Sequence, residues 1–426
     1  MLDIELIRRD PAKTMAGLER RGSRIDVEPI LAADRRRREL IARTEAIRGD
    51  RKRLGQEIGR RRGAGEDSGA LETEAAAARD ELAALTPELE TVEARLRELM
   101  LELPNLPDER VPAGGKEANR VVRTWGEQPE RPSQEDHVEI SRRLGLVDHE
   151  RGTKLGGRGF WLYRGMGAAL EWALLDFFTR SHFADGYEFM LPPHLLLDEV
   201  GYAAGQFPKF VDDVFHLQTA PGERPRFLLP TAETAILSVF GGEILEAGEL
   251  PKKAFAYTPC YRREAGGYGA DERGTVRGHQ FNKVELFQFV TPEQAEAALD
   301  ELVGKAERLV QELGLHYRTS LLAAEDASAS MAITYDVEVW IPSMGTYKEV
   351  SSASHARDYQ ARRANIRYRG DGKRTAYVHT LNASALATSR VVPALLEQNL
   401  QADGSVAVPE PLQQWLGTDR LRPPAS

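Results

Sequence analysis

Residues 254–289, AFAYTPCYRREAGGYGADERGTVRGHQFNKVELFQF, decide the fold of this chain. The apolar and aromatic run 254–261 and the alternating run 279–289 each predict a β-strand. The segment between them is rich in glycine and carries charges of both signs, which is more than a tight hairpin turn needs. We therefore expect two paired strands whose long connecting loop holds a ligand. A simpler interpretation is an ordinary hairpin with a solvated charged loop.

The charged residues at the ends of this loop form a candidate binding site. Arg262 and Glu264 stand two residues apart, so on a continuing strand they share one face, and Glu285 can face the same way from the returning strand. Arg277 and Phe281 lie nearby in the sequence. A guanidinium, carboxylates and an aromatic ring together can bind an anion, an amine and a flat base.

These residues also carry a resemblance to class II aminoacyl-tRNA synthetases, and among them to bacterial-type seryl-tRNA synthetases. A lone Arg-x-Glu would be a weak match, whereas agreement over a whole run is specific. The run that resembles the second signature motif of this class is Tyr261-Arg262-x-Glu264-Ala265-Gly266, Arg273-Gly274 and Arg277-x-His279-Gln280-Phe281-x-Lys283-Val284-Glu285.

Composition bounds the class of protein. With 426 residues and 41% hydrophobic content, the chain has room for one large core or for two or three domains. It contains no apolar run of membrane-spanning length and no secretion signal, and its one cysteine, Cys260, excludes an intrachain disulfide and a thiolate-rich zinc site. We expect a cytoplasmic protein. A net charge of −9 argues against a general DNA or RNA coat, so any RNA contact must be local.

The N-terminal quarter predicts an antiparallel helical hairpin. Apolar residues recur every seven positions from Ala33 to Leu54, and a similar pattern returns from Leu71 to Leu99. A glycine-rich polar stretch at 60–69 separates the two runs and predicts the tip. Pro87 interrupts the second helix, where we expect a kink.

Charge is divided between the two arms of this hairpin. Residues 31–62 hold twelve Arg/Lys and five Asp/Glu, a net charge of +7, whereas residues 66–103 hold three and eleven, a net charge of −8. By itself this pattern favours a dimerisation or spacer coil with solvated faces. The resemblance implies an arm that grips the long variable arm of tRNA(Ser), with candidate contacts Arg35, Arg36, Arg48, Arg51, Lys52, Arg53 and Arg60.

A proline- and glycine-rich segment near 104–120 predicts the domain boundary. We expect an N-terminal tRNA-binding helical domain at 1–110, with its coiled-coil arm at about 27–103, and a catalytic domain at 111–426. An amphipathic helix at 165–182 leads into a strand that ends at Pro192 and Pro193. That order resembles the first class II motif, which builds the homodimer interface, although a plain core helix and edge strand would fit the pattern too.

Three further segments carry polar residues at the ends of predicted elements. Thr231 and Glu233 follow an apolar run, where the simplest interpretation is a helix N-cap with an acid in the first turn. Glu349 and Ser352 lie on a predicted strand and offer oxygens to Mg²⁺, although a solvent-facing acid on an edge strand would also fit. The stretch 379–390 predicts a strand that turns into a helix at Arg390, and it resembles the third class II motif.

The resemblance extends from Leu2 to about Leu416 and implies an α+β fold. That fold is an N-terminal antiparallel coiled-coil hairpin followed by a class II synthetase-like antiparallel β-sheet flanked by helices. It implies an ATP- and Mg²⁺-dependent ligase that activates L-serine as seryl-adenylate and transfers it to the 3′ end of tRNA(Ser). Whether tRNA(Sec) is also charged stays open.

The resemblance also implies residue roles. The catalytic residues would be Arg262, on the α-phosphate and the serine carboxylate, and Arg390, at the γ-phosphate. The other ATP-binding residues would be Glu264, Arg277 and Phe281 around the adenine, with Glu349 and Ser352 holding the metal. Serine itself would be bound by Thr231, Glu233, Arg262, Glu285, Asn382 and Ser384.

Several positions depart from the family pattern. Ala353 and Ala356 stand where cysteine is common, His355 where asparagine is common, and Ala383 and Ala385 where glycine is frequent. A specialised biosynthetic or resistance paralogue therefore stays open. Two other classes of protein also stay open. One is a ligase that loads an amino acid onto a carrier protein, but the presence of the hairpin argues against it. The other is an inactive RNA-binding relative, but the presence of Arg262 and Arg390 argues against it.

Overall fold

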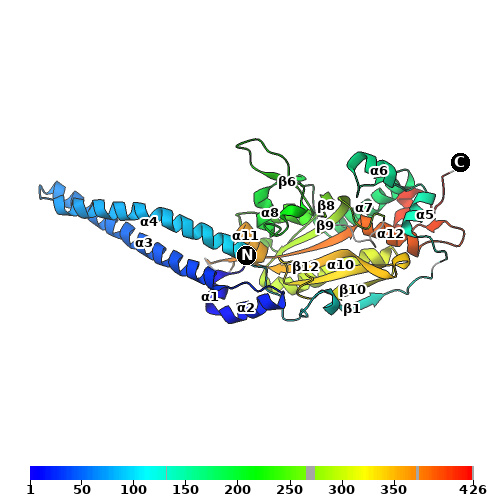
Figure 1. The fold of residues 1–426 in the computed structure, drawn as a ribbon, viewed down its shortest axis with the longest axis horizontal. Coiled ribbons are helices and arrows are strands. Elements are labelled where there is room, and N and C mark those ends of the chain that lie inside the picture. Colours follow the sequence, from blue (N-terminus) through cyan, green and yellow to red (C-terminus); the bar gives the residue numbers. More distant parts are fainter. Residues whose placement is uncertain (131, 265–273, 371–373, 425–426) are drawn as a thin grey trace. The chain divides into compact units, whose positions relative to one another are not determined.

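The computed structural model describes residues 1–130, 132–264, 274–370 and 374–424 (Figure 1). The chain divides into two compact units. The helical unit contains residues 2–19 and 23–104, and the sheet unit contains Met1, residues 20–22 and the chain from Asn105 onward. Within the described ranges, no helix is long and apolar enough to cross a membrane.

The helical unit contains the predicted hairpin. Helix α3 (Glu28–Gly63) pairs with α4 (Gly69–Glu102), after the short helices α1 (Ile4–Arg9) and α2 (Pro11–Arg20). Leu40, Ile47 and Leu54 of the predicted heptad are buried, as the seven-residue spacing requires. The hairpin and the position of its tip are therefore confirmed.

Two details of the helical unit differ from the simple pattern. Ala33 is only half-buried, whereas the neighbouring Asp34 is buried, because Arg8 and Arg38 approach its carboxylate to 3.2 and 3.1 Å. Helix α4 continues through Pro87, and the Thr86 hydroxyl donates to the Leu82 carbonyl at 2.8 Å. Pro87 removes one backbone donor from the helix, and the hydroxyl of Thr86, one residue earlier, provides a side-chain donor to the same helix.

The sheet unit is built on one eight-stranded sheet. Neighbouring strands are antiparallel, except that β4 runs parallel to β8, so the sheet is mixed rather than wholly antiparallel. The strands in spatial order are β1 (Arg120–Trp125), β10 (Tyr317–Leu321), β11 (Ile333–Ile341), β12 (Thr346–Arg357), β15 (His379–Ala387), β9 (Gln280–Val290), β8 (Lys252–Tyr261) and β4 (Glu188–Met190). The two strands predicted from residues 254–289 are β8 and β9, and they pair in register from Lys252–Phe289 to Tyr261–Gln280.

Helices cover both faces of this sheet. Helices α7 (Met166–Ala184), α10 (Ala295–Glu312) and α12 (Thr388–Gln398) contribute to the larger core, together with Val284 and Leu286 of β9. Helices α9 (Ala232–Ser238) and α11 (Tyr359–Ala364) pack on the other face, together with Phe287 and Phe289. Because side chains alternate along a strand, Lys283 and Glu285 lie on this second face. The polar side chains of Lys283 and Glu285 therefore lie next to the apolar cluster that contains Phe287 and Phe289.

The remaining elements are short and lie around the sheet. The remaining helices are α5 (His137–Arg143), α6 (His149–Gly156), α8 (Asp198–Ala204) and α13 (Glu410–Leu416). The remaining strands form four small sheets: β2 (Val147–Asp148) with β3 (Leu162–Tyr163), β5 (Leu195–Leu197) with β6 (Arg226–Leu228), β7 (Ile244–Glu246) with β13 (Arg367–Arg369) and β14 (Thr375–Tyr377), and β16 (Val406–Ala407) with β17 (Arg420–Leu421).

Candidate active site

A buried polar cluster lies at the centre of the sheet, where β9 and β15 pair. The Lys283 ammonium contacts Glu285 at 2.6 Å and the Thr231 hydroxyl at 2.9 Å. The Asn382 amide donates to the other oxygen of Glu285 at 2.9 Å, and the Ser384 hydroxyl lies 3.3 Å from the first. Every one of these side chains is buried, so protein groups take the place of water around the Glu285 carboxylate.

Glu233 borders the same cluster from the start of α9. Thr231 is the N-cap of this helix, as predicted, and its hydroxyl accepts from the Glu233 N–H. One Glu233 oxygen accepts from Gln360 at 2.7 Å and the other lies 3.5 Å from the Asn382 amide. Burial, with the nearby charge of Glu285, raises the pKa of Glu233 to about 7. Two carboxylates that share a buried site need a cation to hold both charges.

The prediction that Arg262 and Glu264 share a face of the first strand was wrong. Strand β8 ends at Tyr261, and Glu264 has a left-handed backbone with φ of 51°, because the chain turns away after the last ladder pair. The Arg262 guanidinium nevertheless lies over the Phe281 ring, 5.2 Å from its centroid, and donates to the Pro230 carbonyl. Glu264 accepts from Arg277 at 2.6 Å.

An open pocket of about 410 Å³ joins these groups. Its lining includes Arg262, Glu264, Arg277, Phe281, Lys283 and Arg390. One wall therefore carries an aromatic ring, and three arginines and a lysine supply positive charge. Such a lining suits a flat base that bears phosphates.

Arg390 enters the pocket from the first turn of α12. Its guanidinium contacts the Glu349 carboxylate at 3.1 Å and the Glu349 carbonyl at 2.9 Å. Burial disfavours the charged form of Glu349, but Arg390 and Arg262 keep its pKa below the ordinary value. Glu349 is therefore an anion that faces two cations.

Ser352 and Asp336 lie next to Glu349 on paired strands. The Ser352 hydroxyl donates to Asp336 at 2.6 Å, and burial together with Glu349 raises the pKa of Asp336 well above its usual range. In the part of the chain that the structure describes, no group of three or more His, Cys, Asp or Glu side chains is arranged to hold a metal. Mg²⁺ commonly takes one or two carboxylates and completes its shell with water and substrate phosphate, so Glu349 and Ser352 fit such an ion.

Two residues that the sequence left without a role belong to this site, and a third, Glu171, packs on the opposite face of β9. Lys283 was quoted only as part of a motif, yet it is the cation that contacts Glu285. Gln360 orients Glu233 from α11. Glu171 of α7 accepts from Asn282 at 2.8 Å and from Thr388 at 2.6 Å, and burial raises its pKa. For Glu171 the one available signal was an acid on the apolar side of a helical pattern.

Part of the predicted site cannot be placed. The glycines at 266, 267 and 269, together with Ala265 and Arg273, lie outside the described residues. Gly274, just beyond them, has a φ of 71° and lies beside the His137 ring.

The candidate tRNA contacts on α3 fall into two groups. Arg35, Arg36, Arg53 and Arg60 form ion pairs with Glu28, Glu88, Asp50 and Glu57. Arg48, Arg51 and Lys52 are exposed and form no ion pair with any residue that the structure describes. These three cations are therefore available to a polyanion without first breaking an ion pair.

Comparisons with known proteins agree over the whole chain. Residues 1–107 match the seryl-tRNA synthetase N-terminal domain, and residues 215–399 match the tRNA synthetase class II core domain for G, H, P, S and T. Serine–tRNA ligase 2 of Clostridium acetobutylicum is 52% identical over 99% of this chain and 100% of its own. Serine–tRNA ligase of Synechococcus elongatus is 43% identical over 98% of each chain.

The fold agrees as well. The structure of seryl-tRNA synthetase from Pyrococcus horikoshii complexed with ATP superimposes with a TM-score of 0.90, covers both chains completely and is 31% identical. With two domains matched in order and full-length relatives at this identity, the chain belongs to the seryl-tRNA synthetase family of class II aminoacyl-tRNA synthetases.

Proposed function

We propose that this chain is a serine–tRNA ligase in which the buried cluster around Glu285 binds serine and the pocket beside it binds ATP. The observation that carries the proposal is the pairing of two buried carboxylates, Glu233 and Glu285, with a single lysine among the described residues of the cluster. Two carboxylates that face one lysine favour the binding of a second cation in the cluster. The ammonium group of serine is that cation, and it places serine next to the arginines that bind the phosphates of ATP.

The reaction needs positioning more than a side-chain nucleophile. A serine carboxylate oxygen attacks the α-phosphorus of ATP, and pyrophosphate leaves to give seryl-adenylate. A hydroxyl of the terminal tRNA ribose then attacks the seryl carbonyl, and AMP leaves. Arg262 bridges the serine carboxylate and the α-phosphate, and Arg390 binds the far phosphates. Cations that face developing charge in a pocket sheltered from water lower the barrier of such steps.

The adenine base stacks on Phe281, with the pair formed by Arg277 and Glu264 at its edge. Glu349 and Ser352 would hold Mg²⁺, which would neutralise charge on the phosphates. Glu285 and Thr231 bind the serine amino group, and Glu233, Asn382 and Ser384 surround the serine side chain. An analogue without the hydroxyl leaves buried polar partners unpaired, at about 1–3 kcal/mol for each.

The arm formed by α3 and α4 binds tRNA(Ser) through its long variable arm. Support comes from the net charge of +7 on residues 31–62 and from Arg48, Arg51 and Lys52, which have no ion-pair partner in the described part of the chain. We assign residues 1–110 to tRNA binding and residues 111–426 to catalysis.

We further propose a homodimer that acts in the cytoplasm. Large apolar side chains are exposed on α7 and around β4, an edge strand of the sheet. Phe183 is 68% exposed, Leu191 is 72% exposed and Trp172 is 54% exposed. A gathered apolar surface of this kind is typical of a subunit interface.

The test is serine-dependent exchange of labelled pyrophosphate into ATP, followed by charging of tRNA(Ser) transcripts. We expect exchange with serine alone among the amino acids, and charging that depends on the long variable arm. Exchange without charging, together with transfer of serine to a carrier protein, would instead favour the carrier-loading ligase.

A further inference from the structure

Helix α11 contributes one buried amide, Gln360, next to the cluster proposed to bind serine. Gln360 is 1% exposed, and it belongs to the sheet unit, as do its hydrogen-bond partners. Its Nε2 donates to the Glu233 carboxylate at 2.7 Å and to the Ala204 carbonyl at 3.0 Å. Its Oε1 accepts from the Thr380 hydroxyl at 2.7 Å. One side chain therefore joins α8, α9 and β15 to α11.

These bonds allow only one orientation of the Gln360 amide. A carbonyl and a carboxylate oxygen act as acceptors, so the NH₂ group has to face Ala204 and Glu233. If the amide were turned over, its oxygen would oppose these two acceptors, and the Thr380 hydroxyl would face a nitrogen that is no acceptor. Because unpaired polar groups are costly in a buried site, the amide is held in the observed orientation.

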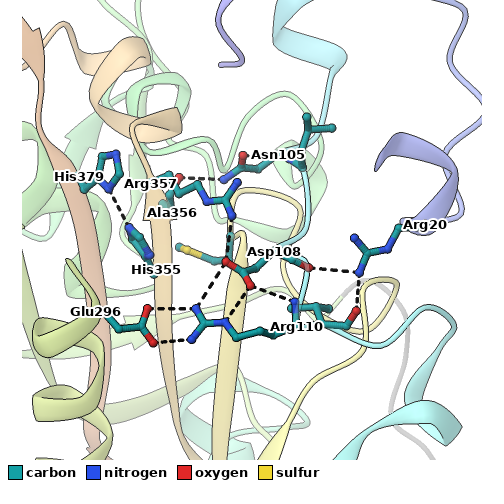
Figure 2. Close-up of polar contacts among 12 residues, drawn as sticks. Arg20, Asn105, Asp108, Arg110, Glu296, His355, Ala356, Arg357 and His379 are labelled. Carbon is teal, nitrogen blue, oxygen red and sulfur yellow. Dashed lines mark hydrogen bonds and ion pairs between the residues drawn. The ribbon is translucent and has the colours of Figure 1, made fainter. Parts of the chain in front are cut away.

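Strand β15 directs Thr380 toward this amide. Thr380 and Asn382 stand two residues apart on the strand, so their side chains share one face. His379 points to the opposite face, where its Nδ1 lies 3.1 Å from the Nε2 of His355 (Figure 2). The strand therefore presents the Thr380 hydroxyl to α11 and the Asn382 amide to the serine cluster.

Glu233 depends on Gln360 for its position. In the described part of the chain, the Glu233 carboxylate accepts from two side chains, the Gln360 amide at 2.7 Å and the Asn382 amide at 3.5 Å. The Lys283 ammonium contacts Glu285 rather than Glu233. Without Gln360, the Glu233 side chain would therefore keep only the longer of its two contacts and would be free to rotate.

The same contacts orient the Asn382 amide. Its Nδ2 lies between the carboxylates of Glu285 and Glu233, at 2.9 and 3.5 Å. Its Oδ1 is buried and has no hydrogen-bond partner among the residues that the structure describes. A buried acceptor without a partner favours a ligand that brings a donor, and the hydroxyl of serine is such a donor. We call the chain of contacts from Thr380 through Gln360 and Glu233 to Asn382 the amide relay.

From the amide relay we propose that Gln360 is a positioning residue that determines the selectivity for serine. It holds Glu233 and, through Glu233, the Asn382 amide, so that the cluster presents its polar groups to a side chain that carries a hydroxyl. The proposal rests on the function proposed above and deepens it. Because the bonds of Gln360 go to Glu233, Thr380 and Ala204, none of which is assigned to ATP, ATP binding does not depend on it.

The test compares Gln360→Met with wild type in pyrophosphate exchange, with serine and with alanine. Methionine keeps the length of the side chain and its apolar contacts but removes the donor and the acceptor. The KM for serine should rise about tenfold, the effect of losing a buried hydrogen bond, whereas the KM for ATP should stay within about twofold of wild type. The preference for serine over alanine, measured as the ratio of kcat/KM values, should fall about tenfold, because a site that binds a hydroxyl discriminates through those bonds.

The matched control is Gln288→Met. Gln288 is also fully buried, and its Nε2 donates to the Tyr187 hydroxyl at 2.5 Å. It lies on the opposite face of β9 from Glu285, because the two residues stand three positions apart. Loss of this second amide should leave the KM for serine and the preference over alanine within about twofold of wild type, since its bond lies outside the serine cluster.

Thr380→Val and Thr380→Ser test the orientation of the amide without changing Gln360 itself. Valine keeps the shape of threonine but lacks the hydroxyl, so Thr380→Val should raise the KM for serine about threefold and leave the KM for ATP unchanged. Thr380→Ser keeps the hydroxyl and should behave like wild type. If Gln360→Met does not fold, as judged by its melting temperature, this pair carries the test, and a Thr380→Val protein with the wild-type KM for serine would overturn the proposal.

Three further results would overturn the proposal: equal rises in the KM for serine and the KM for ATP, an unchanged preference for serine over alanine, or an equal effect of Gln288→Met. Failure of the proposed function itself would look different. It would appear in the wild-type protein, as the absence of serine-dependent exchange.

Discussion

At the scale of single residues, Arg262 is the most exacting test of the site. It stacks over Phe281 and faces the pocket that also holds Lys283 and Arg390. Arg262→Ala should reduce serine-dependent pyrophosphate exchange by about 10²–10³, the effect of losing one key electrostatic donor, or about 3–4 kcal/mol. The neighbouring exposed Arg263 provides the control, and Arg263→Ala should leave exchange unchanged. Near-normal exchange in Arg262→Ala would contradict its assignment.

Glu233 gives a prediction in pH. Burial and Glu285 raise its pKa to about 7 from an ordinary value of 4.5, so the folded protein keeps a proton that the unfolded chain loses between these values. The free energy of unfolding should therefore fall as pH rises from about 4.5 to about 7, by up to about 1.4 kcal/mol per pH unit from this group.

Urea unfolding of wild type and Glu233→Gln over this pH range measures the effect. The amide cannot ionise, so the difference between the two proteins should change steadily through the window and level off above about pH 7. If the free energies of unfolding of the two proteins change in parallel with pH, Glu233 is not the group that keeps a proton in the folded state.

At the scale of elements, the prediction concerns α3. Arg48, Arg51 and Lys52 have no ion-pair partner among the described residues, whereas Arg43 is held by Glu81 at 2.6 Å. Replacing these three cations with glutamine should weaken tRNA binding and reduce the slope of log K against log salt by about one unit for each phosphate that the arm no longer neutralises. Pyrophosphate exchange should not change.

The control for α3 is Arg43→Gln, which should alter the slope much less because its charge is already neutralised. Filter binding of tRNA(Ser) at several salt concentrations gives both slopes. A triple variant with the wild-type slope would mean that the arm binds RNA elsewhere, or serves as a spacer.

At the scale of the whole molecule, the apolar surface on α7 and near β4 predicts self-association. Phe183→Lys combined with Leu191→Asp should produce monomers in analytical ultracentrifugation, because each apolar side chain contributes about 1.5–3 kcal/mol when it is buried. Leu155 of α6 is 79% exposed and offers the control, since Leu155→Lys should leave the association state unchanged. A double variant that sediments like wild type would place the interface on another surface.

The sequence by itself determined the elements and the family. Seven-residue apolar spacing predicted the helical hairpin, and alternation in residues 254–289 predicted β8 and β9, because helix and strand periodicity are local properties of the chain. The order of motif residues along the chain also singled out Arg262, Phe281 and Arg390, and the structure brings these three to one pocket.

Only the tertiary structure decided how these residues meet. The Glu233–Gln360 and Lys283–Thr231 contacts join different elements, and so do the bonds from Glu171 to Asn282 and Thr388. Arg21 is half-buried and donates to backbone carbonyls about 300 residues away in sequence. Backbone carbonyls leave no signature in the sequence, so these contacts could be recognised only where the folded chain brings them together.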